Sequence, residues 1–201
     1  MKRLTFLFVI TSLIFFTGSV FSQNLIKAKI AILHKSGEDY NALHNHDRLH
    51  VGDLMRIFVI PLNECYSYII HSDDKEATIL FNSESNKKLL KDDTLILPSP
   101  SEFYTFDNKS PSAEVIIFCS RNKLSEINNI FKNNSTVSVT EWNKIGNNLI
   151  KKFVKEIKEK TEKPFPIAGN VGAVNDDFID GQLILSGECT LIRKYKIEIK
   201  E

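Results

Sequence analysis

The sequence predicts a mainly β fold with some α structure: an antiparallel β-sandwich followed by an amphipathic helix and closing β-strands. Short segments rich in β-branched and aromatic residues recur from residue 25 to residue 120, with polar turns between them. Helical spacing of apolar residues follows, and strand-like segments return near the C-terminus. We therefore expect a leader at 1–22, a sandwich at 23–131, and an extension at 132–201 that packs on the sandwich.

The leader carries the three parts of a secretory signal peptide. Lys2 and Arg3 form a short basic region, Leu4–Phe16 is almost unbroken apolar sequence, and a small-residue pattern ends at Ser22, before Gln23. The apolar run is short for a membrane anchor, because a span needs about 20 apolar residues. We expect cleavage before Gln23, a periplasmic or secreted product, and no transmembrane span after cleavage.

The charge balance narrows the class of partner. The chain has 26 Lys and Arg residues against 25 Asp and Glu residues, a formal net charge of +1. This balance gives no electrostatic basis for binding nucleic acid, which requires an excess of basic residues. We expect no nucleic acid partner and no cofactor. Because we expect export, we expect the partner to be an envelope protein or a glycan.

Strand composition marks seven segments of the sandwich region. The last of them is apolar on both faces, which indicates a central strand. A polar turn at 73–76 predicts a β-hairpin, and residues 36–47 and 82–93 have the composition of polar connections. The predicted strands are 25–35, 54–62, 65–72, 77–81, 94–98, 102–107 and 113–120.

Two helices are predicted after the sandwich. Leu124, Ile127 and Phe131 recur at helical spacing. Ser138 and Glu141 then fit a capping box, in which each side chain binds the other residue's free backbone N–H. The helix that begins there, at 139–160, carries an apolar stripe of Trp142, Ile145, Leu149, Phe153 and Ile157. We expect this stripe to pack on the sandwich, and docking on a membrane surface stays open as an alternative.

Two closing strands are predicted at 182–187 and 189–199. In the second, alternation divides the residues between two faces. Lys194, Lys196 and Glu198 make one face mostly solvated. The opposite face carries Leu191, Arg193, Tyr195, Ile197 and Ile199.

Residues 50–131 are similar to the opening of the family called domain of unknown function 4384. That family shows a Gly-Asp pair, an apolar strand ending near Pro, an aromatic YxY strand, and a strand ending in Leu-Phe. The matching residues are Gly52, Asp53, Pro61, Tyr66, Tyr68, Leu80 and Phe81. The chain departs from the family at Asp92 and Asp93, where Gly is expected. The resemblance covers about 25–131 well and the C-terminal part weakly.

This resemblance implies an immunoglobulin-like β-sandwich in a cell-surface or periplasmic protein. It implies structural roles for Gly52, Asp53, Tyr66 and Tyr68, and it brings no catalytic residues. Trp142, the only Trp of the chain, is a further structural candidate because it lies at the start of the capped helix.

Three histidines, His44, His46 and His50, lie within seven positions. On an extended strand, residues separated by an even number of positions share a face, and imidazoles so placed bind zinc when further ligands are present. Arg48 would bring a positive charge to the same face, and neighbouring Asn and Asp residues favour a turn. The segment is therefore expected to be a solvated connection that leads into Gly52, with a metal site as the alternative.

The three cysteines, Cys65, Cys119 and Cys189, cannot all pair within one chain. Each lies in an apolar or strand-like run, which favours a buried thiol that acts as a small hydrophobic side chain. Export permits disulfides, so a bridge between Cys65 and Cys119 stays open if their strands face each other.

No catalytic signature surrounds the Ser, Cys or His residues. The acidic stretch 175–188 lacks two ligands of a calcium loop, and the Gly-rich 169–172 lacks the ending of a phosphate loop. We therefore predict an exported, non-catalytic binding or scaffold module of the bacterial cell envelope. The alternative is a metal-binding protein or a metal-dependent hydrolase that uses His44, His46 and His50.

Overall fold

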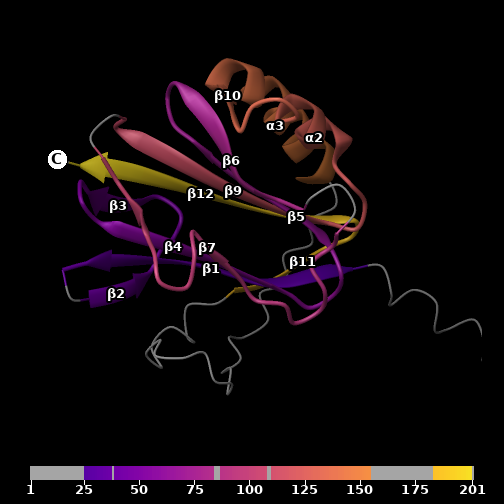
Figure 1. Ribbon diagram of the computed structural model, residues 1–201, viewed down its shortest axis with the longest axis horizontal. Coiled ribbons are helices and arrows are strands. Elements are labelled where there is room, and N and C mark those ends of the chain that lie inside the picture. Colours follow the sequence, from indigo (N-terminus) through magenta and orange to yellow (C-terminus); the bar gives the residue numbers. More distant parts are fainter. Residues whose placement is uncertain (1–24, 38, 84–86, 108–109, 155–182, 201) are drawn as a thin grey trace, which may run out of the picture.

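Two β-sheets and a helical layer are stacked on one another, as the computed structural model shows in Figure 1. The structure describes residues 25–37, 39–83, 87–107, 110–154 and 183–200. The helices cover the outer face of one sheet, and the inner faces of the two sheets meet. This arrangement confirms the predicted mainly β sandwich with some α structure.

The first sheet is antiparallel throughout. Its strand order is β11-β1-β4-β7, with β2 paired to β1 and β8 paired to β4. The bounds are β1 Ile26–Ser36, β2 Asp39–Ala42, β4 Leu54–Pro61, β7 Leu95–Leu97, β8 Tyr104–Thr105 and β11 Leu183–Gly187. The predicted strand at 102–107 is thus reduced to two residues, and β2 lies within a segment predicted as a polar connection.

The second sheet contains both N-terminal and C-terminal strands. Its order is β10-β6-β5-β9-β12-β3, and β9 is central, as its two apolar faces predicted. The ladder between β12 and β3 is parallel and the others are antiparallel. The bounds are β3 Asp47–His50, β5 Tyr66–Ser72, β6 Glu76–Asn82, β9 Ser112–Ser120, β10 Thr136–Ser138 and β12 Thr190–Lys200.

Strand alternation fills the space between the sheets with aliphatic side chains. Ile30 on β1 and Ile57 on β4 face Ile117 on β9, and all are completely buried. From β12, the predicted inner face contributes Leu191 and Tyr195 to the same core. We refer to this cluster of buried residues as the inter-sheet core.

The helices bury a second cluster against the outer face of the second sheet, which we call the helix–sheet core. The helices are α2, Ser125–Ile130, and α3, Val139–Val154. Trp142 is 1% exposed and meets Phe118 edge to face, with ring centroids 6.4 Å apart. A Cβ atom at Gly146 would come within 3.0 Å of the Trp142 ring, so the glycine makes room for it. The predicted packing of this helix on the sandwich is therefore confirmed.

Polar contacts fix the start of each helix. The Ser138 hydroxyl accepts a hydrogen bond from the Glu141 backbone N–H at 3.2 Å, as the capping motif predicted. Tyr68 is fully buried, and its hydroxyl accepts a hydrogen bond from the Leu124 N–H at 3.0 Å, just before α2. Burial raises the pKa of Tyr68 above its usual value, so the hydroxyl stays protonated.

Several predicted features lie outside the described residues. They include the signal peptide, Ile157 of the apolar stripe, the Gly-rich 169–172, and most of the acidic stretch that begins at 175. Within the part of the chain that the structure describes, none of the helices has both the length and the apolar character that a membrane span requires.

Candidate functional site

The histidine segment folds as a turn and a short strand. His46 has a φ of 70°, and only His50 belongs to β3. The three imidazoles therefore do not share one strand face, which was the premise of a metal site. Among the residues that the structure describes, no three His, Cys, Asp or Glu side chains are arranged to hold a metal ion.

One turn geometry recurs three times and explains the aspartates beside these histidines. In each turn the fourth residue is Asp, its side chain accepts a hydrogen bond from the first residue's N–H, and its own N–H binds the first residue's carbonyl. The third residue has positive φ, as a type II turn requires. The distance from the first residue's backbone N to the Asp Oδ2 is 2.6 Å for His44–Asp47, 2.9 Å for His50–Asp53 and 2.8 Å for Leu90–Asp93. The third residues of the three turns have φ values of 70° at His46, 94° at Gly52 and 65° at Asp92.

The second of these turns joins β3 to β4 and also holds the chain near β8. Gly52 N–H donates to the Phe106 carbonyl at 2.9 Å, and Phe106 N–H donates to the Asp53 carbonyl at 3.1 Å. Asp53 is buried, and its side-chain oxygen accepts a hydrogen bond from the His50 N–H. Gly52 and Asp53 therefore have a structural role, because their backbone hydrogen bonds join this turn to the segment around Phe106.

Cys65 and Cys119 lie side by side in the inter-sheet core as free thiols. The Ser67 hydroxyl is 3.7 Å from Cys65 Sγ and 3.5 Å from Cys119 Sγ. Ser67, not Cys65, stands directly opposite Cys119 in the β5–β9 ladder, so the two cysteines are diagonal neighbours. The two thiols are therefore neighbours and free, and the bridge that the sequence left open is not formed.

Tyr66 lies on the opposite face from Ser67 and is partly buried. Lys88 Nζ and Lys123 Nζ lie 5.6 Å and 5.8 Å from the centre of its ring. Lys88 also pairs with Glu64 at 3.8 Å. These contacts anchor the start of β5 to neighbouring loops, which is a structural role.

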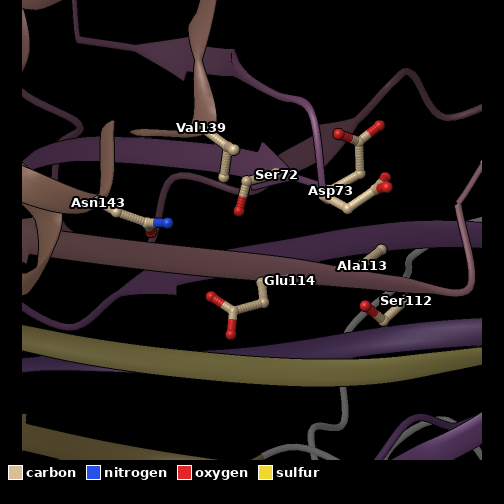
Figure 2. A pocket seen from close by; sticks show the side chains of 8 residues that line it. Ser72, Asp73, Ser112, Ala113, Glu114, Val139 and Asn143 are labelled. Atoms are coloured by element: carbon tan, nitrogen blue, oxygen red, sulfur yellow. The ribbon is translucent and has the colours of Figure 1, made fainter. Parts of the chain in front are cut away.

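A polar hollow of about 240 Å³ lies where α3 begins above the second sheet (Figure 2). Its walls come from the β5–β6 hairpin, the start of β9 and the first turns of α3. The lining residues are Ser72, Asp73, Asp74, Ser112, Ala113, Glu114, Val139 and Asn143. The hollow forms because the hairpin and the helix meet at their ends, where the Val139 N–H donates to the Lys75 carbonyl at 2.9 Å.

Ser72 is the least expected residue of the hollow. Its side chain is 4% exposed, it ends β5, and Figure 2 shows its hydroxyl directed into the space that Asn143 borders. Within the described part of the chain, this hydroxyl has no hydrogen-bond partner. Among the described residues, the side-chain atoms that are buried without a partner are His34 Nδ1, Asn82 Oδ1 and Arg193 Nε. Ser72 Oγ is not one of them, so water in the hollow reaches it and a ligand could replace that water.

The acids of the hollow are held in place by their neighbours. Glu114 Oε2 lies 2.7 Å from Lys194 Nζ on the adjacent strand β12. Asp73 Oδ1 accepts hydrogen bonds from the N–H groups of Lys75 and Glu76 at 2.7 and 2.8 Å. Burial alone would raise the pKa of Asp73, but these hydrogen bonds and the nearby positive charges hold it below its usual value.

Sequence reasoning missed this hollow. Its residues come from three separated segments, and none has an unusual type or spacing. The signal that could have found it is the pair Asp73–Asp74 in a predicted hairpin turn, which places carboxylates at the end of a sheet.

Together the layers and the hollow define a two-sheet β-sandwich with a helical cover and a polar recess beneath the start of that cover. No protein-family model, no curated protein and no solved structure matches the chain.

Proposed function

We propose that the chain is an exported, non-catalytic binding module of the cell envelope, and that the polar hollow is its ligand site. The observation that carries this proposal is the Ser72 hydroxyl, which is directed into the hollow and has no protein partner among the described residues. A bound polar ligand would supply this hydroxyl with a hydrogen bond. The signal-peptide pattern and the resemblance to a family of exported immunoglobulin-like domains support the compartment.

The chemistry of the hollow favours binding over catalysis. Glu114 is paired with Lys194, and Asp73 is held by two backbone N–H groups. The pKa of Asp73 lies below its usual value, so this acid stays ionised near neutral pH, whereas a general acid needs a pKa close to the working pH. These groups therefore suit fixed hydrogen-bond acceptors and charges.

Two measurements test the proposal. Mass spectrometry of the protein from envelope fractions should give an N-terminus at Gln23, and retention of Met1 would contradict export. A thermal-shift screen of the purified protein with small polar ligands should find compounds whose effect is lost in Ser72→Ala. Ser36→Ala is the matched control, because Ser36 also ends a strand but is exposed. Equal responses of both variants would rule out the hollow as the ligand site.

A further inference from the structure

We infer that the hollow binds a primary alkyl ammonium group, carried either by a free aliphatic diamine or by a lysine side chain. This inference rests on the proposed function and adds the chemical class of the ligand. It follows from the charge of the lining, the placement of its acids on two elements, and the neutral groups beside them.

The lining has an excess of negative charge. Asp73, Asp74 and Glu114 contribute carboxylates, and none of the eight lining residues is basic. Lys194, which lies outside the lining, neutralises Glu114 in part. Asp73 stays ionised for the reasons given above. A ligand that enters this space is therefore favoured when it carries positive charge.

The acids are not grouped as a metal ion requires. Asp73 and Asp74 begin the β5–β6 hairpin turn, Glu114 lies on β9 opposite Ser72, and among the described residues no three acids, His or Cys are arranged to hold a metal. Calcium and magnesium need several oxygen ligands within about 2.0–2.6 Å of one point. An organic cation suits carboxylates on two elements more readily, because its chain can extend from one element to the other.

Neutral groups complete the recognition of an ammonium. Figure 2 shows Ser72 and Asn143 extending toward each other from β5 and α3, with the Glu114 carboxylate on the neighbouring strand. An ammonium has three donors and no acceptor, so a hydroxyl oxygen, an amide oxygen and a carboxylate together match it. The side chains of Val139 and Ala113 offer apolar contact for the methylene groups of the ligand, as lysine stems often find.

Binding is measured by calorimetry and by amide NMR shifts of the mature protein with cadaverine, Nα-acetyl-lysine and the neutral analogue pentanediol. We expect the two ammonium compounds to bind, to shift the amide signals of residues 72–74 and 143, and to weaken as salt rises. Pentanediol should bind at least about tenfold more weakly, because it lacks the charge that the acids recognise. If cadaverine binds more tightly than Nα-acetyl-lysine, the ammonium group comes from a free diamine. If Nα-acetyl-lysine binds more tightly, it comes from a lysine side chain of a protein.

Variants separate the hollow from general surface attraction. Glu114→Gln and Ser72→Ala should each weaken cadaverine at least about tenfold, since a charged and a neutral acceptor are removed. Glu188→Gln, which removes an exposed acid in the β11–β12 turn, should leave affinity unchanged. Circular dichroism melting of each variant confirms that it is folded.

The outcomes distinguish this inference from the proposed function. If pentanediol binds as tightly as cadaverine, or if Glu114→Gln has no effect, the ammonium inference is wrong while the hollow remains a ligand site. If no compound shifts the signals of residues 72–74, 112–114 and 143, the hollow is not a ligand site and both statements fail.

Discussion

The two cores of this protein differ in the side chains that build them. Two of the twenty buried residues of the inter-sheet core are aromatic, Phe106 and Tyr195. In the helix–sheet core five of eleven are aromatic: Tyr68, Phe118, Phe131, Trp142 and Phe153. The same strands, β5 and β9, contribute to both cores through their opposite faces.

Geometry explains the difference. Two sheets pack about 10 Å apart, so aliphatic side chains from both faces interdigitate and fill the space evenly. A helix contacts a sheet along one stripe, and a few large side chains must bridge the remaining distance. Stability is therefore spread over many residues between the sheets and concentrated in Trp142 under the helices.

The largest expected effect is a difference between the buried and the exposed cysteines in their rate of chemical labelling. Cys65 and Cys119 are fully buried between the sheets, whereas Cys189 is exposed. The hydrogen bond with Cys65 and burial also raise the pKa of Cys119 well above its usual value. In native protein, iodoacetamide should modify Cys189 at least about 1,000-fold faster than the other two, which become accessible only on unfolding. Mass spectrometry of labelled peptides measures this, and early labelling of Cys119 would show that the inter-sheet core opens locally.

Trp142→Ala should break the helix–sheet core. Loss of a buried aromatic side chain costs about 3–5 kcal/mol of unfolding free energy. Urea denaturation followed by circular dichroism measures the loss, and Trp142→Phe should recover part of it. Native tryptophan emission should be blue-shifted and move to the red on unfolding. A loss below about 1 kcal/mol, typical of surface positions, would contradict the packing of α3.

Tyr68→Phe should have an intermediate effect. The ring remains, but the buried Leu124 N–H loses its acceptor at the start of α2. An unsatisfied buried donor costs about 1–3 kcal/mol. The same denaturation measurement applies, and Tyr66→Phe is the control because no hydrogen bond of its hydroxyl is present among the described residues. Equal effects of both variants would remove the special role of Tyr68.

Ser138→Ala should cost about 1 kcal/mol, the usual loss for an N-cap side chain. Its hydroxyl accepts from Glu141 N–H in an exposed position, so only the helix end is affected. Ser138→Asp should restore most of the loss, because Asp is an equally good cap. Failure of Asp to restore stability would show that the hydroxyl has another role.

The smallest expected effect is a pH dependence of stability, caused by His71 on the inter-sheet side of β5. Burial lowers the pKa of His71 below 6.5, although Asp73, Glu76 and Asp107 oppose the shift. The unfolded chain then binds more protons, so stability should fall as the pH drops below 6.5 and level off below the folded-state pKa. Chemical denaturation between about pH 4.5 and 7 avoids most carboxylate titration. His71→Gln should flatten the dependence of stability on pH in this window. An unchanged slope would show that other groups cause the pH dependence.

Most long strands could be predicted from the sequence, because alternation of apolar residues reports directly on a two-faced sheet. The strands β2 and β3 could not, because Asp39–Ala42 and Asp47–His50 are polar edge segments that form by pairing with β1 and β12. The parallel β3–β12 ladder joins residues about 150 positions apart along the chain, as the Arg48–Glu198 contact at 2.9 Å illustrates. Local pattern contains no information about such a pair.

The candidate site was predicted less well than the fold. The histidines drew attention because His residues are rare, yet the observed turn geometry is determined by Asp47, Asp53 and Asp93. Cys65 and Cys119 were correctly expected to be buried, whereas the same expectation was wrong for Cys189, which lies exposed in the β11–β12 turn. The diagonal register of the first two depends on tertiary pairing. Ser72 has an ordinary type and position, and only the direction of its side chain into the hollow distinguishes it.

The place of β12 has a consequence for the order in which the protein can be assembled. This strand lies inside the second sheet, and its ladder with β9 runs from Thr190 to Glu198. A ribosome makes residues 190–200 after all the other strands, so until then β9 and β3 present unpaired edges to any neighbouring chain. The second sheet therefore cannot be completed before residues 190–200 have been made. Removal of this last strand should therefore yield aggregates rather than a smaller sandwich.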